Sequence, residues 1–97
     1  MGKPIACTLV AVDRDLQGRR WRDVAERTSV ERLELPNGLR LVFGAEPGVP
    51  QELEELVATE RECCAFADWT LTHRGGRVTL DITATGGAVP VVQGMFA

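Results

Sequence analysis

The fold of this chain is most constrained by four segments in which apolar and polar residues alternate. They form two pairs, and a turn that contains glycine joins the two segments of each pair. Residues 32–35 and 39–43 flank Pro36-Asn37-Gly38, and an Asn-Gly step between alternating segments is the strongest short-range signal for a β-hairpin. Residues 69–73 and 77–83 flank Arg74-Gly75-Gly76 in the same way. The sequence therefore predicts two hairpins, each with one face toward a core.

A helix is predicted between the hairpins, over residues 51–67, after a loop at 44–50 that carries two prolines and two glycines. The segment 51–67 contains no glycine or proline, and its apolar residues alternate with charged ones. At about 100° of rotation per residue, one side of this helix carries Leu53, Leu56, Val57, Glu60, Cys63, Cys64 and Ala67. The acidic residues Glu52, Glu54, Glu55 and Glu62 fall on the flanks or on the opposite side.

The remaining segments complete an α+β pattern. Residues 5–12 form an apolar run rich in β-formers, so we predict a first strand there. Asp13 or Asp15 is expected to begin a helix that runs to about Thr28. Residues 88–96 are expected to form a short terminal helix. The inward side of the first helix is expected to hold Leu16, Trp21, Val24, Ala25 and Thr28. The order β-α-β-β-α-β-β-α predicts one domain over residues 1–97, a two-layer fold whose largely antiparallel sheet has its helices on one face.

Composition excludes several classes of partner. The chain has 97 residues, a net charge of −3 and scattered basic residues, which argues against a surface for nucleic acid or an anionic membrane. No apolar run approaches the roughly 20 residues that span a bilayer. The first residues lack the apolar stretch of a secretory signal, so we expect a cytoplasmic protein with no membrane partner.

Three cysteines, Cys7, Cys63 and Cys64, are the residues with the most distinctive chemistry. Their odd number argues against a disulfide framework. Soft ions such as Hg(II), Cu(I) and As(III) prefer two or three thiolates and need no histidine. Neighbouring cysteines on a helix diverge by about 100°, so one ion is better held by Cys7, on a strand beneath the helix, together with Cys63 or Cys64. We predict a site for a soft metal or metalloid ion, Zn(II) included, at these thiols.

Glu60 lies in the middle of the apolar side of the predicted helix, one turn before the cysteine pair. A carboxylate there is costly to bury without a partner or a proton. It is a candidate metal ligand, or a nearby base that accepts the protons thiols lose on binding metal. A structural role is the other interpretation, with an ion pair or hydrogen bond to Arg40, Arg20 or a strand threonine.

Two further hypotheses for the chain stay open. In one, Glu60 activates Cys63 or Cys64 in a thiol redox sensor or cysteine-nucleophile enzyme. In the other, the chain is a structural or partner-binding module whose cysteines only pack in the core. His73, the only histidine, is expected to be solvated at the end of a strand. An exposed apolar edge strand would favour a homodimer, although the sequence does not locate one.

The whole chain resembles small, uncharacterised bacterial proteins of actinobacterial type that accompany heavy-metal, especially mercury, resistance genes. The resemblance rests on Ile5-Ala6-Cys7-Thr8-Leu9, Pro36-Asn37-Gly38, the E-x-x-C-C-x-F segment from Glu60 to Leu71, and Phe96. It implies that Cys7, Cys63 and Cys64 belong to one three-thiol site, and that a metal-resistance protein is a possible partner. Where relatives have proline after the cysteine pair this chain has Ala65, and Trp69 stands at their usual phenylalanine.

Overall fold

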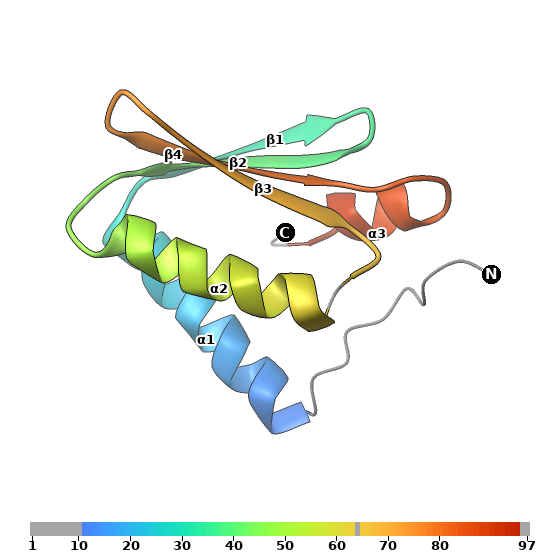
Figure 1. The fold of residues 1–97 in the computed structure, drawn as a ribbon, viewed down its shortest axis with the longest axis horizontal. Helices are drawn as coiled ribbons and strands as arrows, with labels where there is room; N and C mark the ends of the chain where they lie inside the picture. Colours follow the sequence, from blue (N-terminus) through green and yellow to red (C-terminus); the bar gives the residue numbers. More distant parts are fainter. Residues whose placement is uncertain (1–10, 64, 96–97) are drawn as a thin grey trace.

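A computed structural model of the chain describes residues 11–63 and 65–95. It has seven helices and strands in this described part, arranged as an open four-stranded sheet with helices packed against it (Figure 1). In chain order they are α1 (Ala11–Arg27), β1 (Val30–Leu35), β2 (Gly38–Gly44), α2 (Val49–Cys63), β3 (Asp68–Arg74), β4 (Arg77–Thr83) and α3 (Ala88–Gln93). The α+β fold predicted from the sequence is confirmed.

Both predicted hairpins are present, and all strand pairs are antiparallel. The strands lie in the order β1-β2-β4-β3, so the two hairpins meet through β2 and β4. Leu35 pairs with Gly38 around the Pro36-Asn37 turn, and Arg74 pairs with Arg77 around Gly75-Gly76. Gly75 and Gly76 have φ values of 56° and 75°, the left-handed conformation that a tight hairpin turn requires and that glycine adopts at little cost.

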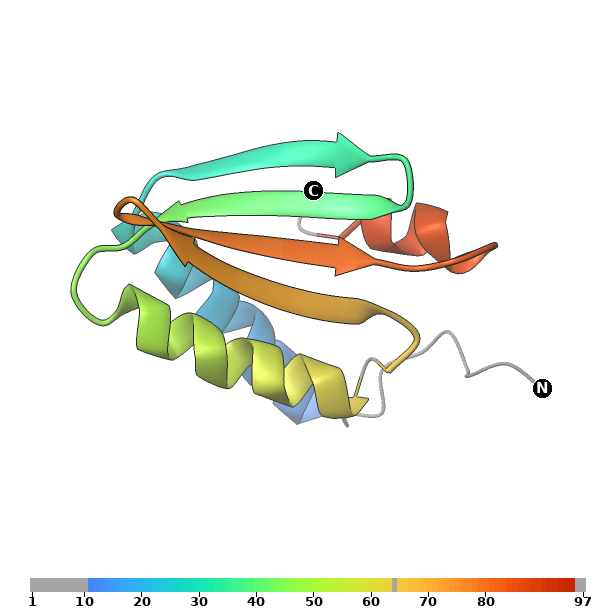
Figure 2. The same cartoon turned by 45° about the horizontal axis from the view of Figure 1, so that its top comes forward.

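The hydrophobic core lies between one face of the sheet and the three helices, which lie on that face (Figures 1 and 2). The alternation of β2 and β4 explains it, because Leu41 pairs with Leu80 and Phe43 with Val78 on the same face. The fully buried side chains include Val24, Leu39, Val49, Leu53, Leu56, Val57, Val78, Leu80, Ile82 and Val92. The opposite face carries polar pairs such as Arg40 and Asp81, joined by two hydrogen bonds of 2.7 and 2.9 Å.

The N-terminal part of the chain corrects the prediction. Residues 5–10 of the predicted first strand lie outside the described residues, and Ala11 and Val12 are helical, so the strand is wrong at those two positions. The helix already includes Ala11 and Val12, so it does not begin at Asp13 or Asp15 as predicted. Cys7, predicted to lie on that strand, is also outside the described residues.

The inward side of α1 is also different from the prediction. Trp21 and Val24 are buried as expected, but Leu16 is 52% exposed and Ala25 is exposed. Gln17 is buried instead, with 7% of its surface exposed. The positions 17, 21 and 24 follow the i, i+4, i+7 spacing of one helix face, and Leu16 lies about 100° away from that face.

Two helices end earlier than predicted. The central helix, α2, ends at Cys63 and not at Ala67, because residues 65–67 form the turn that leads into β3. Ala67 is nevertheless buried, as the pattern required. The terminal helix, α3, ends at Gln93, and Phe96 is outside the described residues. Among the described helices, none has the length and apolar character needed to cross a membrane.

Candidate functional site

The predicted site residues lie at the end of α2 and beyond the described part of the chain. Cys63 is the last residue of α2, and Glu60 lies three residues earlier on the same helix. Cys64 and Cys7 are outside the described residues. The described geometry is therefore that of the surroundings of the cysteine pair: the Glu60 carboxylate, the facing side of α1 and the turn into β3.

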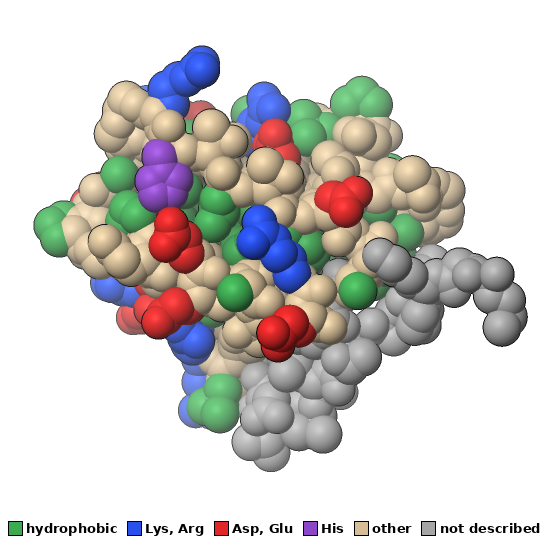
Figure 3. All heavy atoms as spheres, viewed as in Figure 1, with side chains coloured by type: hydrophobic (Ala, Val, Ile, Leu, Met, Phe, Trp, Pro, Cys, Tyr) green, Lys and Arg blue, Asp and Glu red, His purple; other side chains and the backbone are tan. Residues whose placement is uncertain are grey.

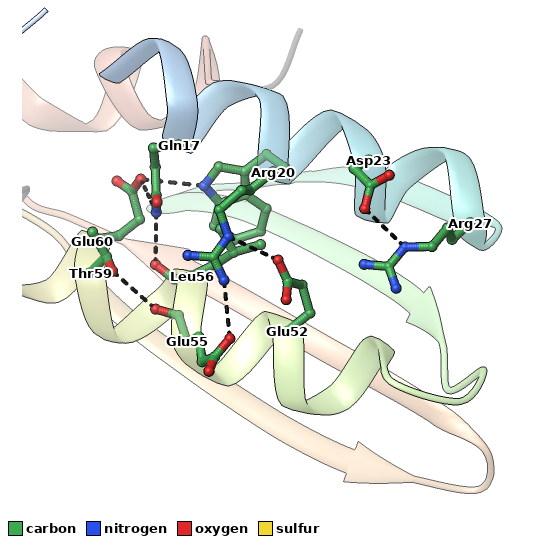
Figure 4. A network of polar contacts seen from close by, with 10 residues as sticks. Gln17, Arg20, Asp23, Arg27, Glu52, Glu55, Leu56, Thr59 and Glu60 are labelled. Atoms are coloured by element: carbon green, nitrogen blue, oxygen red, sulfur yellow. Dashed lines mark hydrogen bonds and ion pairs between the residues drawn. The ribbon is translucent and has the colours of Figure 1, made fainter. Parts of the chain in front are cut away.

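Glu60 is buried, with 8% of its surface exposed, and faces α1. Its Oε1 atom accepts hydrogen bonds from Gln17 Nε2 at 3.1 Å and from Trp21 Nε1 at 3.3 Å (Figure 4). Gln17 Nε2 also donates to the backbone oxygen of Leu56 at 3.1 Å. The carboxylate thus has donors in the core, which reduces the cost of its burial.

The partners of Glu60 differ from those considered for a structural role. Arg40 binds Asp81 on the opposite face of the sheet, and Arg20 binds Glu52 and Glu55. The two donors that reach Glu60, an amide and an indole, are both neutral. They hold the carboxylate in place without supplying a compensating positive charge.

Salt bridges join α1 and α2, which run antiparallel to each other. Arg20 Nε lies 2.9 Å from Glu52 Oε1, and Arg20 Nη2 lies 3.1 Å from Glu55 Oε2. The hydrogen bond to Glu52 raises the pKa of the Arg20 guanidinium above its usual value, so the cation persists at any physiological pH. Because Gln17 contacts Glu60 while Arg20 contacts Glu52, the start of α1 lies toward the cysteine end of α2 (Figure 4).

The turn that follows the cysteine pair is fixed by Arg61. Its Nε and Nη2 atoms donate to the backbone oxygen of Trp69 at 3.1 and 2.7 Å. Trp69 is 4% exposed and belongs to the core. A shallow depression of about 590 Å³ lies at this turn, lined by residues that include Arg61, Ala65, Ala67, Asp68 and Trp69. Arg61 therefore connects the last turn of α2 to the start of β3.

Other candidate ligands lie apart from this region. His73 is exposed, and its Nε2 lies 3.9 Å from Glu54 Oε1, in keeping with the expected solvated histidine. Within residues 11–63 and 65–95, no group of three or more His, Cys, Asp or Glu side chains is arranged to hold a metal ion.

Two comparisons with known proteins, one with protein-family models and one with curated sequences, found no match. No family model matches this chain, and no curated protein is similar to it.

Gln17, which holds Glu60 in place from α1, was not among the residues predicted to face inward. Glutamine is usually exposed, so its residue type does not indicate the inward side of a helix. Its spacing of four residues from Trp21 was the available signal.

Replacement of Glu60 tests the role of its hydrogen bonds. Glu60→Ala removes the shared acceptor of two buried hydrogen bonds, so we expect it to lower the free energy of unfolding by about 2–3 kcal/mol. Glu60→Gln keeps an acceptor oxygen of the same shape, and we expect a loss below about 1 kcal/mol. Urea denaturation followed by circular dichroism measures both. Equal losses in the two variants would show that the charge of Glu60, and not its role as acceptor, matters for stability.

Proposed function

We propose that this protein binds one soft metal or metalloid ion, such as Hg(II), Cu(I), As(III) or Zn(II), through the thiolates of Cys7, Cys63 and Cys64. The ion is its cargo, which it scavenges or hands on to another protein. The observation that carries the proposal is the position of the cysteine pair: it begins at the last residue of α2, one turn after a buried carboxylate and beside the helix from which the Cys7 segment departs.

Chain length makes convergence of the three thiols feasible. Gln17 contacts Glu60 across the two helices, and from there α1 extends about 9 Å back to Ala11 while α2 extends about 4.5 Å on to Cys63, at 1.5 Å per residue. These extensions run in the same direction because the helices are antiparallel. Cys7 precedes Ala11 by four residues, which span at most about 14 Å. Cys7 is therefore within reach of the end of α2.

The chemistry of the surroundings suits thiolate binding of a cation. A thiol must lose its proton to bind metal, and a carboxylate one turn away can receive that proton. Gln17 and Trp21 both donate hydrogen bonds to Oε1 of Glu60, and these bonds direct the carboxylate toward α1. In this proposal, therefore, the sulfur atoms are the ligands and Glu60 is a nearby base. Several acidic side chains also lie over α2 (Figure 3), and negative charge raises the local concentration of cations.

Native mass spectrometry tests the proposal. In the presence of excess glutathione, a competing monothiol, we expect the folded protein to retain one Hg(II) ion per chain. Binding of the ion should release protons. A variant in which Cys7, Cys63 and Cys64 are all serine is the control. Equal retention of Hg(II), Cu(I) and Zn(II) by the protein and the control would refute the proposal.

A second control separates a built site from ordinary thiol affinity. The same protein in urea has the same three cysteines but no helix pair to bring them together. If the three thiols converge in the fold, the folded protein must retain Hg(II) at a higher glutathione concentration than the unfolded protein does. Identical competition curves would mean that the thiols bind as independent groups.

A further inference from the structure

β1 is exposed on both of its faces, unlike the three other strands. In the part of the chain that the structure describes, it has a neighbouring strand on one side only, β2. Its first five residues are exposed and its last is half-buried, and two of its large apolar side chains, Val30 and Leu33, are 37% and 50% exposed. An exposed edge of this kind is a template for another strand.

The backbone of β1 determines which residues can pair at its free edge. Gly44 N donates to Ser29 O at 3.2 Å, so Ser29 directs its backbone groups toward β2. Because these directions alternate along an antiparallel strand, residues 31, 33 and 35 also face β2. Val30, Arg32 and Glu34 therefore direct their N–H and C=O groups outward.

We propose that a second copy of this chain pairs antiparallel with β1, in a register centred on Leu33. This register places Arg32 opposite Glu34 of the second copy, and Glu34 opposite its Arg32, so two pairs of opposite charges meet. The same residues carry the outward backbone groups, which gives four N–H···O bonds across the twofold axis. The two copies of Leu33 meet on the face of the sheet opposite the helices. Contact there removes both exposed leucine side chains from water and stabilises the strand pair.

Charge excludes the neighbouring registers. A register centred on Arg32 would place the two Arg32 side chains opposite each other, and one centred on Glu31 would do the same with two Glu31 carboxylates. Like charges directly opposite each other destabilise a strand pair. A register centred between two residues would match outward backbone groups with inward ones. Among these registers, only the one centred on Leu33 both pairs outward backbone groups with each other and places opposite charges face to face.

An apolar groove beside the same edge adds contact area. It has a volume of about 280 Å³ and is lined by Trp21, Ala25, Val30, Arg32, Leu41 and Phe43. In the proposed register Pro36 of the second copy lies opposite Val30, at the groove. Arg32 is held here by bonds from its Nη2 to the backbone oxygens of Gln93 and Met95, and guanidinium has five N–H donors, so others are available to a carboxylate.

Charge reversal tests the proposed dimer. Light scattering coupled to size-exclusion chromatography should show a dimer of the full chain at about 100 µM, and Glu34→Arg should raise its dissociation constant at least about tenfold by opposing arginines. Arg32→Glu should do the same by opposing glutamates. Mixing the two variants places the acidic side chains of one chain opposite the basic side chains of the other at both positions, and a one-to-one heterodimer should form.

Two controls keep this test specific to β1 and independent of folding. Val91→Lys replaces another exposed apolar residue, 43% exposed on α3, and should leave the dimer intact. Circular dichroism checks that each variant is folded. A monomeric wild-type protein at this concentration, or a dimer unaffected by Glu34→Arg, would overturn the proposal. So would failure of the two folded charge variants to associate with each other.

Discussion

Cys63→Ser and Cys64→Ser should each lower the affinity of the folded protein for Hg(II) by about 100-fold or more. Each replacement removes a thiolate from the proposed site, and loss of even a residue that only supports a metal ligand costs about 10–100-fold. The hydroxyl of serine does not replace a thiolate for a soft ion. Competition with glutathione, followed by the ultraviolet absorption of the mercury–thiolate bond, measures the change.

The matched control for these variants changes a polar residue of the same helix. Thr59→Ser alters a half-buried side chain of α2 whose hydroxyl bonds to Glu55 O within the helix. It should bind Hg(II) as the wild type does. Unchanged affinity in both cysteine variants would show that the pair does not hold the ion, and would favour the hypothesis that these cysteines only pack.

Gly38→Ala should produce the largest loss of stability among the single substitutions considered, about 3–5 kcal/mol. A Cβ atom at this position would lie 1.9 Å from the backbone oxygen of Ile82 and 2.9 Å from Cα of Thr83. Both atoms belong to β4, which pairs with β2 in the centre of the sheet. The strands must separate to admit the methyl group, and urea denaturation measures the resulting loss.

Gly18→Ala is the control for this substitution. Gly18 lies within α1, and a Cβ atom there meets nothing within 4 Å. Alanine is preferred to glycine inside a helix by roughly 0.5–1 kcal/mol, so this variant should be more stable than the wild type. A Gly38→Ala protein within about 1 kcal/mol of the wild type would contradict the packing described for β2 and β4, because overpacking of a tight contact costs more than that.

The sheet was predictable because its signals are local. The turn residues Pro36-Asn37 and Gly75-Gly76 and the alternation beside them define both hairpins, and the structure has both. The inward side of α2 followed from the 3.6-residue period, which places Leu53, Leu56 and Val57 in the core. That period also placed Glu60 on the buried side, and it is buried.

The errors arose where contacts between distant segments decide the structure. The end of α2 at Cys63 depends on how far the chain must turn to enter β3, which no local pattern states. The burial of Gln17 depends on Glu60, which is 43 residues away in the sequence. The pairing of β2 with β4 joins two hairpins, and a pattern of alternation cannot specify which strands become neighbours.

X-ray absorption spectroscopy of the one-to-one Hg(II) complex tests the convergence of the thiols most directly, because it counts the sulfur atoms bound to the ion. Three converging thiols predict three sulfur ligands in the wild type and one fewer in Cys7→Ser. The same sulfur count in both proteins would place Cys7 outside the site and contradict the account.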